Sequence, residues 1–196
     1  MAGAHPEQPT FYYDLASPEA YLVAERSAAV LGAVPVWQPV RLAGLRAGEV
    51  GPFRCAAEID AFQEDIGRRA AAYGLQPLRW PAEFPSDPEW AMLVATYAKQ
   101  IGRAVAFSLA AFRQAFAGGR DLSDPDTVML AAAACEMHPV AIEKGARLAS
   151  IARRLDDATA AAATAGVVDV PAVRVGERVF HGDRELELAA AELAAV

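Results

Sequence analysis

Two strand patterns that flank one helix pattern, within residues 10–40, constrain the fold of this chain most strongly. Thr10–Tyr13 is rich in β-branched and aromatic residues, which favour strands. Ser17-Pro18 then predicts a helix start, because serine is a good N-cap and proline suits the first helical position. Val34–Val40 predicts a second strand. A helix of this length between two strands is typical of a right-handed parallel β-α-β unit.

The segment that follows, about residues 45–138, is predicted to be all-helical. Apolar residues recur there at helical spacing, and Asp-Pro pairs open new helices. We expect Asp87 to cap one helix, with Pro88 in its first turn, and we expect residues 41–54 to form a glycine-containing loop. A further helix is expected to run through Phe116 and to end at Gly118-Gly119. The aromatic residues of these helices are expected either to belong to the core or to line a substrate pocket.

The end of the chain returns to β-structure. Ala172–Val175 predicts a strand, Gly176-Glu177 a turn, and Arg178–Phe180 its partner strand, before a second turn and a closing helix over Glu185–Ala195. The whole order is β-α-β, a helical block, then α-β-β-α, which is the order of the thioredoxin fold. We therefore predict an α/β, thioredoxin-like fold with an inserted all-helical subdomain, divided into residues 8–44, 45–138 and 139–196.

In that fold a proline opens the third strand, opposite the first helix, and usually has a cis peptide bond. Pro171 occupies this place in the order. A cis bond before proline costs only about 0.5–1 kcal/mol. An ordinary trans proline at the first residue of a strand is the alternative.

Composition excludes several classes of protein. The chain has 196 residues, of which 54% are hydrophobic, which suits one domain with a sizeable core. Its net charge is −7 and it has no block of Lys and Arg, which argues against nucleic-acid binding. It has no run of 18 apolar residues, so no membrane association is expected. Met1–Pro9 lacks a hydrophobic signal region, which favours the cytoplasm.

The cysteines and histidines do not form a recognisable redox or metal motif. Cys55 and Cys135 are far apart and neither belongs to a C-x-x-C pair, so a paired-thiol redox centre is not predicted. His5, His138 and His181 have no metal-ligand spacing with either cysteine. We therefore predict no metal site.

Three segments carry a resemblance to a known family: Phe11–Leu22, Gly166–Val173 and Phe180–Leu186. With these motifs the chain resembles the 2-hydroxychromene-2-carboxylate isomerase family, which is related to kappa-class glutathione transferases and to DsbA-like oxidoreductases. The resemblance covers about residues 10–40 and 140–195, and the helical insert in arrangement. It implies an isomerase or transferase that uses glutathione or another small thiol on an aromatic or unsaturated substrate, and it allows a homodimer.

The resemblance also implies roles for individual residues. Ser17 matches the serine that hydrogen-bonds the glutathione sulfur, and Val170, before Pro171, matches the residue whose backbone pairs with the cysteinyl backbone. Gly182 and Asp183 match the turn that holds the γ-glutamyl end, with Asp183 suited to its ammonium group. A hydroxyl at a helix N-terminus can stabilise a thiolate. The alternative is that Ser17 only caps the helix.

This sequence departs from the family pattern at three places. Glu19 stands where an aromatic residue is common, and Gly182 where a polar side chain is frequent. The loop Gly48–Pro52 lacks the usual asparagine and brings a carboxylate, Glu49. Two other functions therefore stay open: a DsbA-like oxidoreductase without its C-x-x-C, and a non-catalytic thioredoxin-fold binding module.

Overall fold

The computed structural model describes residues 8–46 and 53–195, and its centre is one mixed four-stranded sheet. The strands are β1 (Thr10–Tyr13), β2 (Val36–Pro39), β3 (Ala172–Val175) and β4 (Arg178–His181), in the order β2-β1-β3-β4. β1 is parallel to β2 and antiparallel to β3, and β3 is antiparallel to β4. The two ends of the chain thus form a single sheet, which confirms the predicted thioredoxin-like fold.

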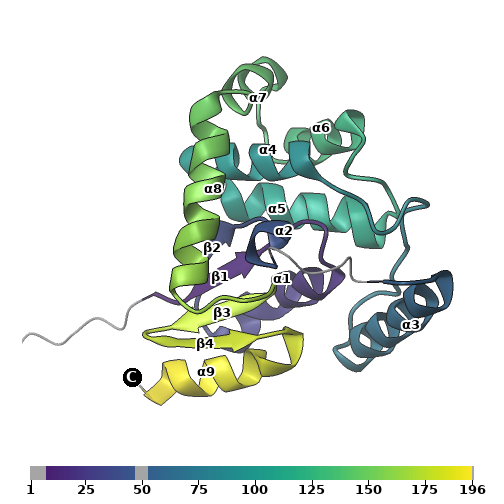
Figure 1. The fold of residues 1–196 in the computed structure, drawn as a ribbon, viewed down its shortest axis with the longest axis vertical. Helices are drawn as coiled ribbons and strands as arrows, with labels where there is room; N and C mark the ends of the chain where they lie inside the picture. The colour runs from purple at the N-terminus through teal and green to yellow at the C-terminus, as the bar shows by residue number, and fades with distance from the viewer. Residues whose placement is uncertain (1–7, 47–52, 196) are drawn as a thin grey trace, which may run out of the picture.

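Both faces of the sheet are covered. Neighbouring side chains of a strand point to opposite faces, so β1 contributes side chains to a core on each face. Phe11 and Tyr13 are fully buried in the main core, together with residues of α1 (Pro18–Leu31) and α9 (Leu186–Ala195). Tyr12 belongs to a second, smaller core with residues that include Ala162 of α8 (Ala149–Thr164). In Figure 1, α9 lies below the β3–β4 hairpin, whereas α8 stands upright above the hairpin at the left of the view.

Helices fill the stretch between β2 and α8, as the sequence predicted. They are α2 (Leu42–Leu45), α3 (Ala56–Ala72), α4 (Glu89–Gln100), α5 (Ala104–Phe112), α6 (Pro125–Ala133) and α7 (Pro139–Gly145). Figure 1 shows α4, α5, α6 and α7 stacked above the sheet, whereas α3 lies apart from them beside α1. The predicted division at residues 45 and 138 remains a prediction.

Three local predictions need correction. The predicted loop after β2 contains the short helix α2. Asp87 does not cap α4: the helix begins at Glu89, because Pro88 has a non-helical ψ of 44° and itself stands at the N-cap. The helix expected through Phe116 ends as α5 at Phe112 and continues as a π-helical turn over Arg113–Ala117.

The Val170–Pro171 peptide bond is cis, as the position of Pro171 in the element order predicted. The departure at Glu49 lies outside the described residues. None of the helices in the described part of the chain combines the length and apolar character needed to cross a membrane.

Candidate functional site

Ser17 lies at the N-terminus of α1, where the sequence predicted a cap. Its Oγ accepts a hydrogen bond of 3.1 Å from the Ala20 N–H, and its side chain is buried, with 5% exposure of the residue. Pro18, the first helical residue, has no N–H to satisfy. The structure therefore places the hydroxyl at the positive end of the helix dipole, where an anion is favoured.

Asp14 shapes the turn that delivers Ser17 from β1. One carboxylate oxygen accepts a bond of 2.9 Å from the Ala16 N–H, and the other accepts a bond of 2.8 Å from the Leu42 N–H at the start of α2. The Asp14 carbonyl accepts from the Ser17 N–H at 3.0 Å. Burial raises the pKa of the Asp14 carboxyl, although both backbone hydrogen bonds oppose the shift. One carboxylate thus fixes the turn and α2 together.

Pro171 lies at the end of β1 that leads into this turn. The last pair of the β1–β3 register is Tyr12 with Ala172, so the residue before Ala172 adjoins the Tyr13 end of β1. Val170, on the other side of the cis bond, donates its N–H to the Asp169 carboxylate at 2.7 Å. Among hydrogen bonds between described residues, the Val170 carbonyl accepts none. Within the described part of the chain, this carbonyl is therefore the backbone group of Val170 that could bind a ligand.

Gly182 links the cis-proline segment to the start of the last helix. Its N–H donates to the Pro171 carbonyl at 2.8 Å. Its backbone has φ 77° and ψ 167°, a conformation that is essentially restricted to glycine. This backbone conformation explains why the chain has glycine at position 182, where the 2-hydroxychromene-2-carboxylate isomerase family often has a polar side chain.

Asp183 is buried, with 1% exposure, and its carboxylate already has partners within the chain. One oxygen is ion-paired with the Arg69 guanidinium of α3, and the other accepts a bond of 2.8 Å from the Tyr73 hydroxyl. The guanidinium of Arg26 stacks over the Tyr73 ring at 3.5 Å from its centroid. The end of α3 therefore covers the carboxylate that the resemblance assigns to a ligand ammonium group.

Arg69 also binds Glu19, the first-turn acid of α1. Its Nη1 lies 2.9 Å from a Glu19 oxygen, and its Nε lies 2.9 Å from Asp65. Burial lowers the pKa of Arg69, but the hydrogen bond to Glu19 and the nearby carboxylates outweigh it, so the pKa is raised. Burial raises the pKa of Glu19; Arg69 opposes that shift, and the charge of Asp183 adds to it. Three carboxylates share this one guanidinium.

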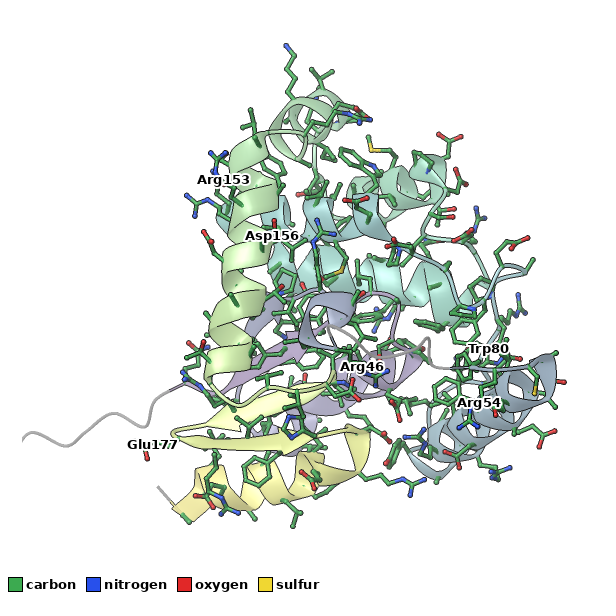
Figure 2. The ribbon with its side chains drawn as sticks, viewed as in Figure 1. Arg46, Arg54, Trp80, Arg153, Asp156 and Glu177 are labelled. Carbon is green, nitrogen blue, oxygen red and sulfur yellow. The ribbon has the colours of Figure 1, made fainter. Side chains whose placement is uncertain are left out.

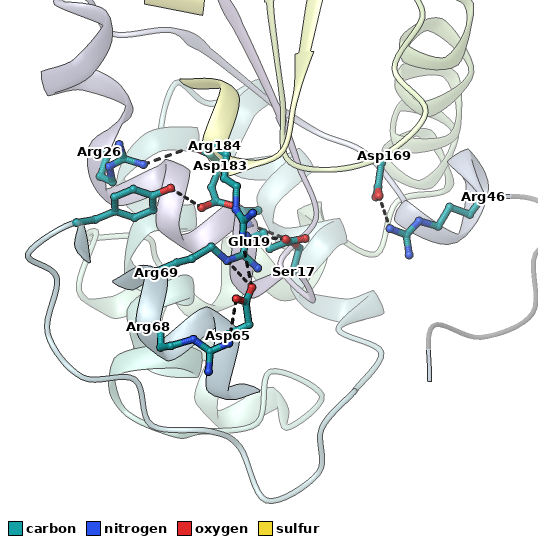
Figure 3. Close-up of polar contacts among 12 residues, drawn as sticks. Ser17, Glu19, Arg26, Arg46, Asp65, Arg68, Arg69, Asp169, Asp183 and Arg184 are labelled. Atoms are coloured by element: carbon teal, nitrogen blue, oxygen red, sulfur yellow. Dashed lines mark hydrogen bonds and ion pairs between the residues drawn. The ribbon is translucent and has the colours of Figure 1, made fainter. Parts of the chain in front are cut away.

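A second ion pair lies on the opposite side of Ser17. Arg46, at the end of α2, is paired with Asp169, the residue whose carboxylate also accepts the Val170 N–H. Figure 3 shows Ser17 between this pair and the group formed by Glu19, Arg69 and Asp183. The helix N-terminus thus lies between two arginines, each of which is held by carboxylates of the chain.

Sequence reasoning named Ser17, Val170, Pro171, Gly182 and Asp183, and the structure brings all five to one end of the sheet. It missed four residues that surround them, namely Arg46, Arg69, Tyr73 and Asp169. Their partners are remote in sequence; Arg69 and Asp183, for example, are 114 residues apart. No local motif signals such pairs.

The two histidines of the described chain have structural partners instead of a catalytic arrangement. His138 caps α7, where its Nδ1 accepts the Val140 N–H at 3.2 Å. The Nε2 of His181 accepts the Val168 N–H at 3.3 Å.

A mixed sheet in the order β2-β1-β3-β4, a polar residue at the start of α1 and a cis-proline before β3 define a thioredoxin-like protein. The family model of the DSBA-like thioredoxin domain matches residues 10–194, and the chain belongs to this family. No curated protein matches the chain.

Solved structures with the same fold have diverse names. A 2-hydroxychromene-2-carboxylate isomerase superposes with a TM-score of 0.85 at 23% identity, over 95% of this chain and 94% of that one. A probable DsbA oxidoreductase from Streptomyces coelicolor superposes with a TM-score of 0.77 at 21% identity, over 97% of this chain and 89% of that one. The cytosolic disulfide reductase DsbM from Pseudomonas aeruginosa, in a structure with glutathione, superposes with a TM-score of 0.63 at 14% identity, over 96% of each chain. At these identities the likeness shows the fold alone.

Proposed function

We propose that the chain is a thiol-dependent isomerase or transferase, similar to 2-hydroxychromene-2-carboxylate isomerase, that binds glutathione or another small thiol beside Ser17. The observation that carries the proposal is the pairing of a hydroxyl at a helix N-terminus with a cis-proline, where the carbonyl of the preceding residue accepts no hydrogen bond from any described residue. The structural likeness to an isomerase of that name and to a disulfide reductase with glutathione supports it at the level of the fold.

The residues present fit the central part of such a ligand. Ser17 would meet the sulfur, since its hydroxyl can donate a hydrogen bond while its oxygen still accepts the Ala20 N–H. The Val170 carbonyl would accept an N–H from the ligand backbone. The γ-glutamyl end fits less well, because Asp183 is buried and paired with Arg69 and Tyr73. An ammonium group there would have to share this carboxylate.

The chain's own residues would bind the thiol and stabilise its ionised form. An unperturbed thiol of pKa about 8.5 is mostly protonated at neutral pH. A hydroxyl donor and a helix N-terminus both favour the anion and lower that pKa. When bound, the thiolate would supply the nucleophile that adds reversibly to an electrophilic carbon of the substrate.

A partly exposed aromatic cluster supports an aromatic or unsaturated substrate. Phe62 of α3 stacks on Phe84 with ring centroids 6.3 Å apart, Phe53 packs on Phe62, and Trp80 packs edge-on against Phe84. All four residues are partly exposed. Phe62 and Arg69 are seven residues apart on α3 and therefore lie on one face of that helix. Figure 2 shows Trp80 beside α3.

The two cysteines give little support to the oxidoreductase alternative. Ser17 and Ala20 occupy the positions of a C-x-x-C pair, and Ala20 is fully buried. Cys55 and Cys135 are free thiols, one exposed and one buried. A dithiol for exchange chemistry is therefore not formed by the described residues.

The proposal is tested with Ser17→Ala, by following the thiolate absorbance of bound glutathione against pH. Loss of the donor should raise the pKa of the bound thiol by about one unit, since one unit corresponds to about 1.36 kcal/mol, a typical hydrogen-bond contribution. Binding of S-methylglutathione should stay near normal. Ser27→Ala is the matched control, because the Ser27 Oγ is buried on the same helix with no partner among described residues.

Two results would contradict the proposal. If Ser17→Ala only lowers the thermal stability, while the bound thiol titrates as in the wild type, Ser17 is a helix cap alone. If no small thiol binds the wild-type protein in a calorimetric titration, the fold serves as a non-catalytic binding module.

A further inference from the structure

Glu19 is the side chain of the thiol site that departs most from the resembling family, and its position suggests a use. It follows Ser17 by two residues, in the first turn of α1, and its carboxylate binds Arg69 at 2.9 Å. Arg69 has only 12% of its side chain exposed, so little of the guanidinium is accessible to anything else. Glu19 thus occupies the cation closest to the Asp183 end of the site.

We propose that Glu19 determines ligand specificity by occupying Arg69, so that the site disfavours thiols with a carboxylate on the α3 side. The inference rests on the proposed function. A ligand that lies along Ser17 with one end toward Asp183 would bring that end to Arg69 (Figure 3). A carboxylate on that end of the ligand would have to displace the Glu19 carboxylate from Arg69. Glu19 is part of the protein chain, so its interaction with Arg69 carries no entropic cost of association, whereas that of the ligand does.

The charge around this subsite works in the same direction. Glu19, Asp65 and Asp183 all bind Arg69, so three negative charges surround one positive charge. Arg68 and Arg184 also approach Asp65, but both side chains are 68% exposed, which makes them weak, screened partners. Arg26, which stacks over the Tyr73 ring, is only 10% exposed, but its charge is paired with Glu187. The subsite is therefore net negative, and it suits a thiol whose arm at this end is neutral or cationic.

The test compares two probe thiols that differ in this arm. Glutathione carries a γ-glutamyl carboxylate, whereas N-acetylcysteinylglycine has a neutral acetyl group in place of the γ-glutamyl group. Glu19→Gln removes the competing charge while keeping the shape of the side chain and a hydrogen-bond acceptor for Arg69. By calorimetric titration we expect this variant to bind glutathione about tenfold more tightly than the wild type, the worth of a typical charge-assisted hydrogen bond. Its affinity for N-acetylcysteinylglycine should stay within about twofold.

Glu25→Gln is the matched control. Glu25 lies on the same helix, and its carboxylate binds the Arg113 side chain through two bonds of 2.7 and 2.8 Å. This substitution removes the same charge from α1 but does not touch Arg69. It should leave the ratio of the two affinities unchanged.

Each outcome decides the inference. A selective gain for glutathione in Glu19→Gln alone supports it. Equal gains for both thiols would overturn it, because the effect would then act on the sulfur or on the fold and not on the arm. Unchanged affinities for both would overturn it as well. Binding of neither thiol to any variant would instead refute the proposed function on which the inference rests.

Discussion

Replacing Arg69 by methionine should destabilise the protein far more than most single substitutions on α3. The guanidinium is the shared partner of Glu19 and Asp183, and it connects α3 with the N-termini of α1 and of the last helical segment. Methionine keeps most of the length and apolar volume of arginine but carries no charge. Asp183, at 1% exposure, would then keep the Tyr73 hydroxyl as its one side-chain partner among the described residues.

The magnitude follows from the burial of this pair. Removing one partner of a buried ion pair costs about 3–5 kcal/mol, because a charge is left buried without its counter-ion. The Tyr73 hydrogen bond remains, so we expect the low end of the range, about 3 kcal/mol. For a chain of this size, 1 kcal/mol shifts the melting temperature by about 2–4 °C. The expected loss is therefore about 6–12 °C.

Thermal and urea unfolding, followed by circular dichroism, would measure this loss. Arg68→Met is the matched control: Arg68 precedes Arg69 on α3, is 68% exposed and pairs with Glu64 and Asp65 of the same helix. Exposed ion pairs contribute about 0–1 kcal/mol, so this variant should melt within about 4 °C of the wild type. Adding Asp183→Asn to Arg69→Met should restore part of the loss, because no unpaired charge would remain at that position. Equal losses in the Arg68 and Arg69 variants would refute the reasoning.

Two further substitutions, the first with a control substitution on α3, test the backbone and the buried acid of the site. Gly182→Ala should lower the free energy of unfolding in urea by about 1–3 kcal/mol, because φ 77° and ψ 167° are essentially restricted to glycine. The control is Gly67→Ala within α3, where an added Cβ meets nothing within 4 Å, and it should stabilise the protein by about 0.5–1 kcal/mol. Similar effects of the two substitutions would contradict the geometry. Burial raises the pKa of Asp14 in the folded state above its unfolded value of about 3.9, so the folded chain retains this proton to higher pH and the group's contribution to stability falls as pH rises above about 4. Asp14→Asn should therefore flatten the dependence of the unfolding midpoint on pH in that window, and an unchanged slope would argue against this assignment.

Features that depend on local sequence or on element order were predictable. Ser17 caps α1 as expected, because an N-cap needs only the following turn of the same helix. The Asp124-Pro125 pair opens α6 as predicted, and the Asp124 carboxylate accepts the Asp126 N–H at 3.0 Å. The cis bond before Pro171 followed from the place of that proline in the chain order. These features need no knowledge of distant partners.

The remaining features depend on contacts that the sequence pattern does not contain. The pairing of Arg69 with Asp183 joins residues on α3 and before α9, and only the packing of α3 beside α1 brings them together. α2 begins where its first N–H meets the Asp14 carboxylate, a partner 28 residues away. The role predicted for Asp183 considered the turn alone and did not include Arg69 of α3 and Tyr73 at the C-cap of that helix, which bind its carboxylate.

The central claim is that a small thiol binds at the N-terminus of α1, beside the cis-proline. The most direct measurement is a titration of the ¹⁵N-labelled protein with reduced glutathione, followed through its amide resonances. The account predicts the largest shifts at the N–H groups of Glu19, Val170 and Gly182, which surround Ser17 and Pro171. Largest shifts on α6 and α7, or none at saturating thiol, would contradict it.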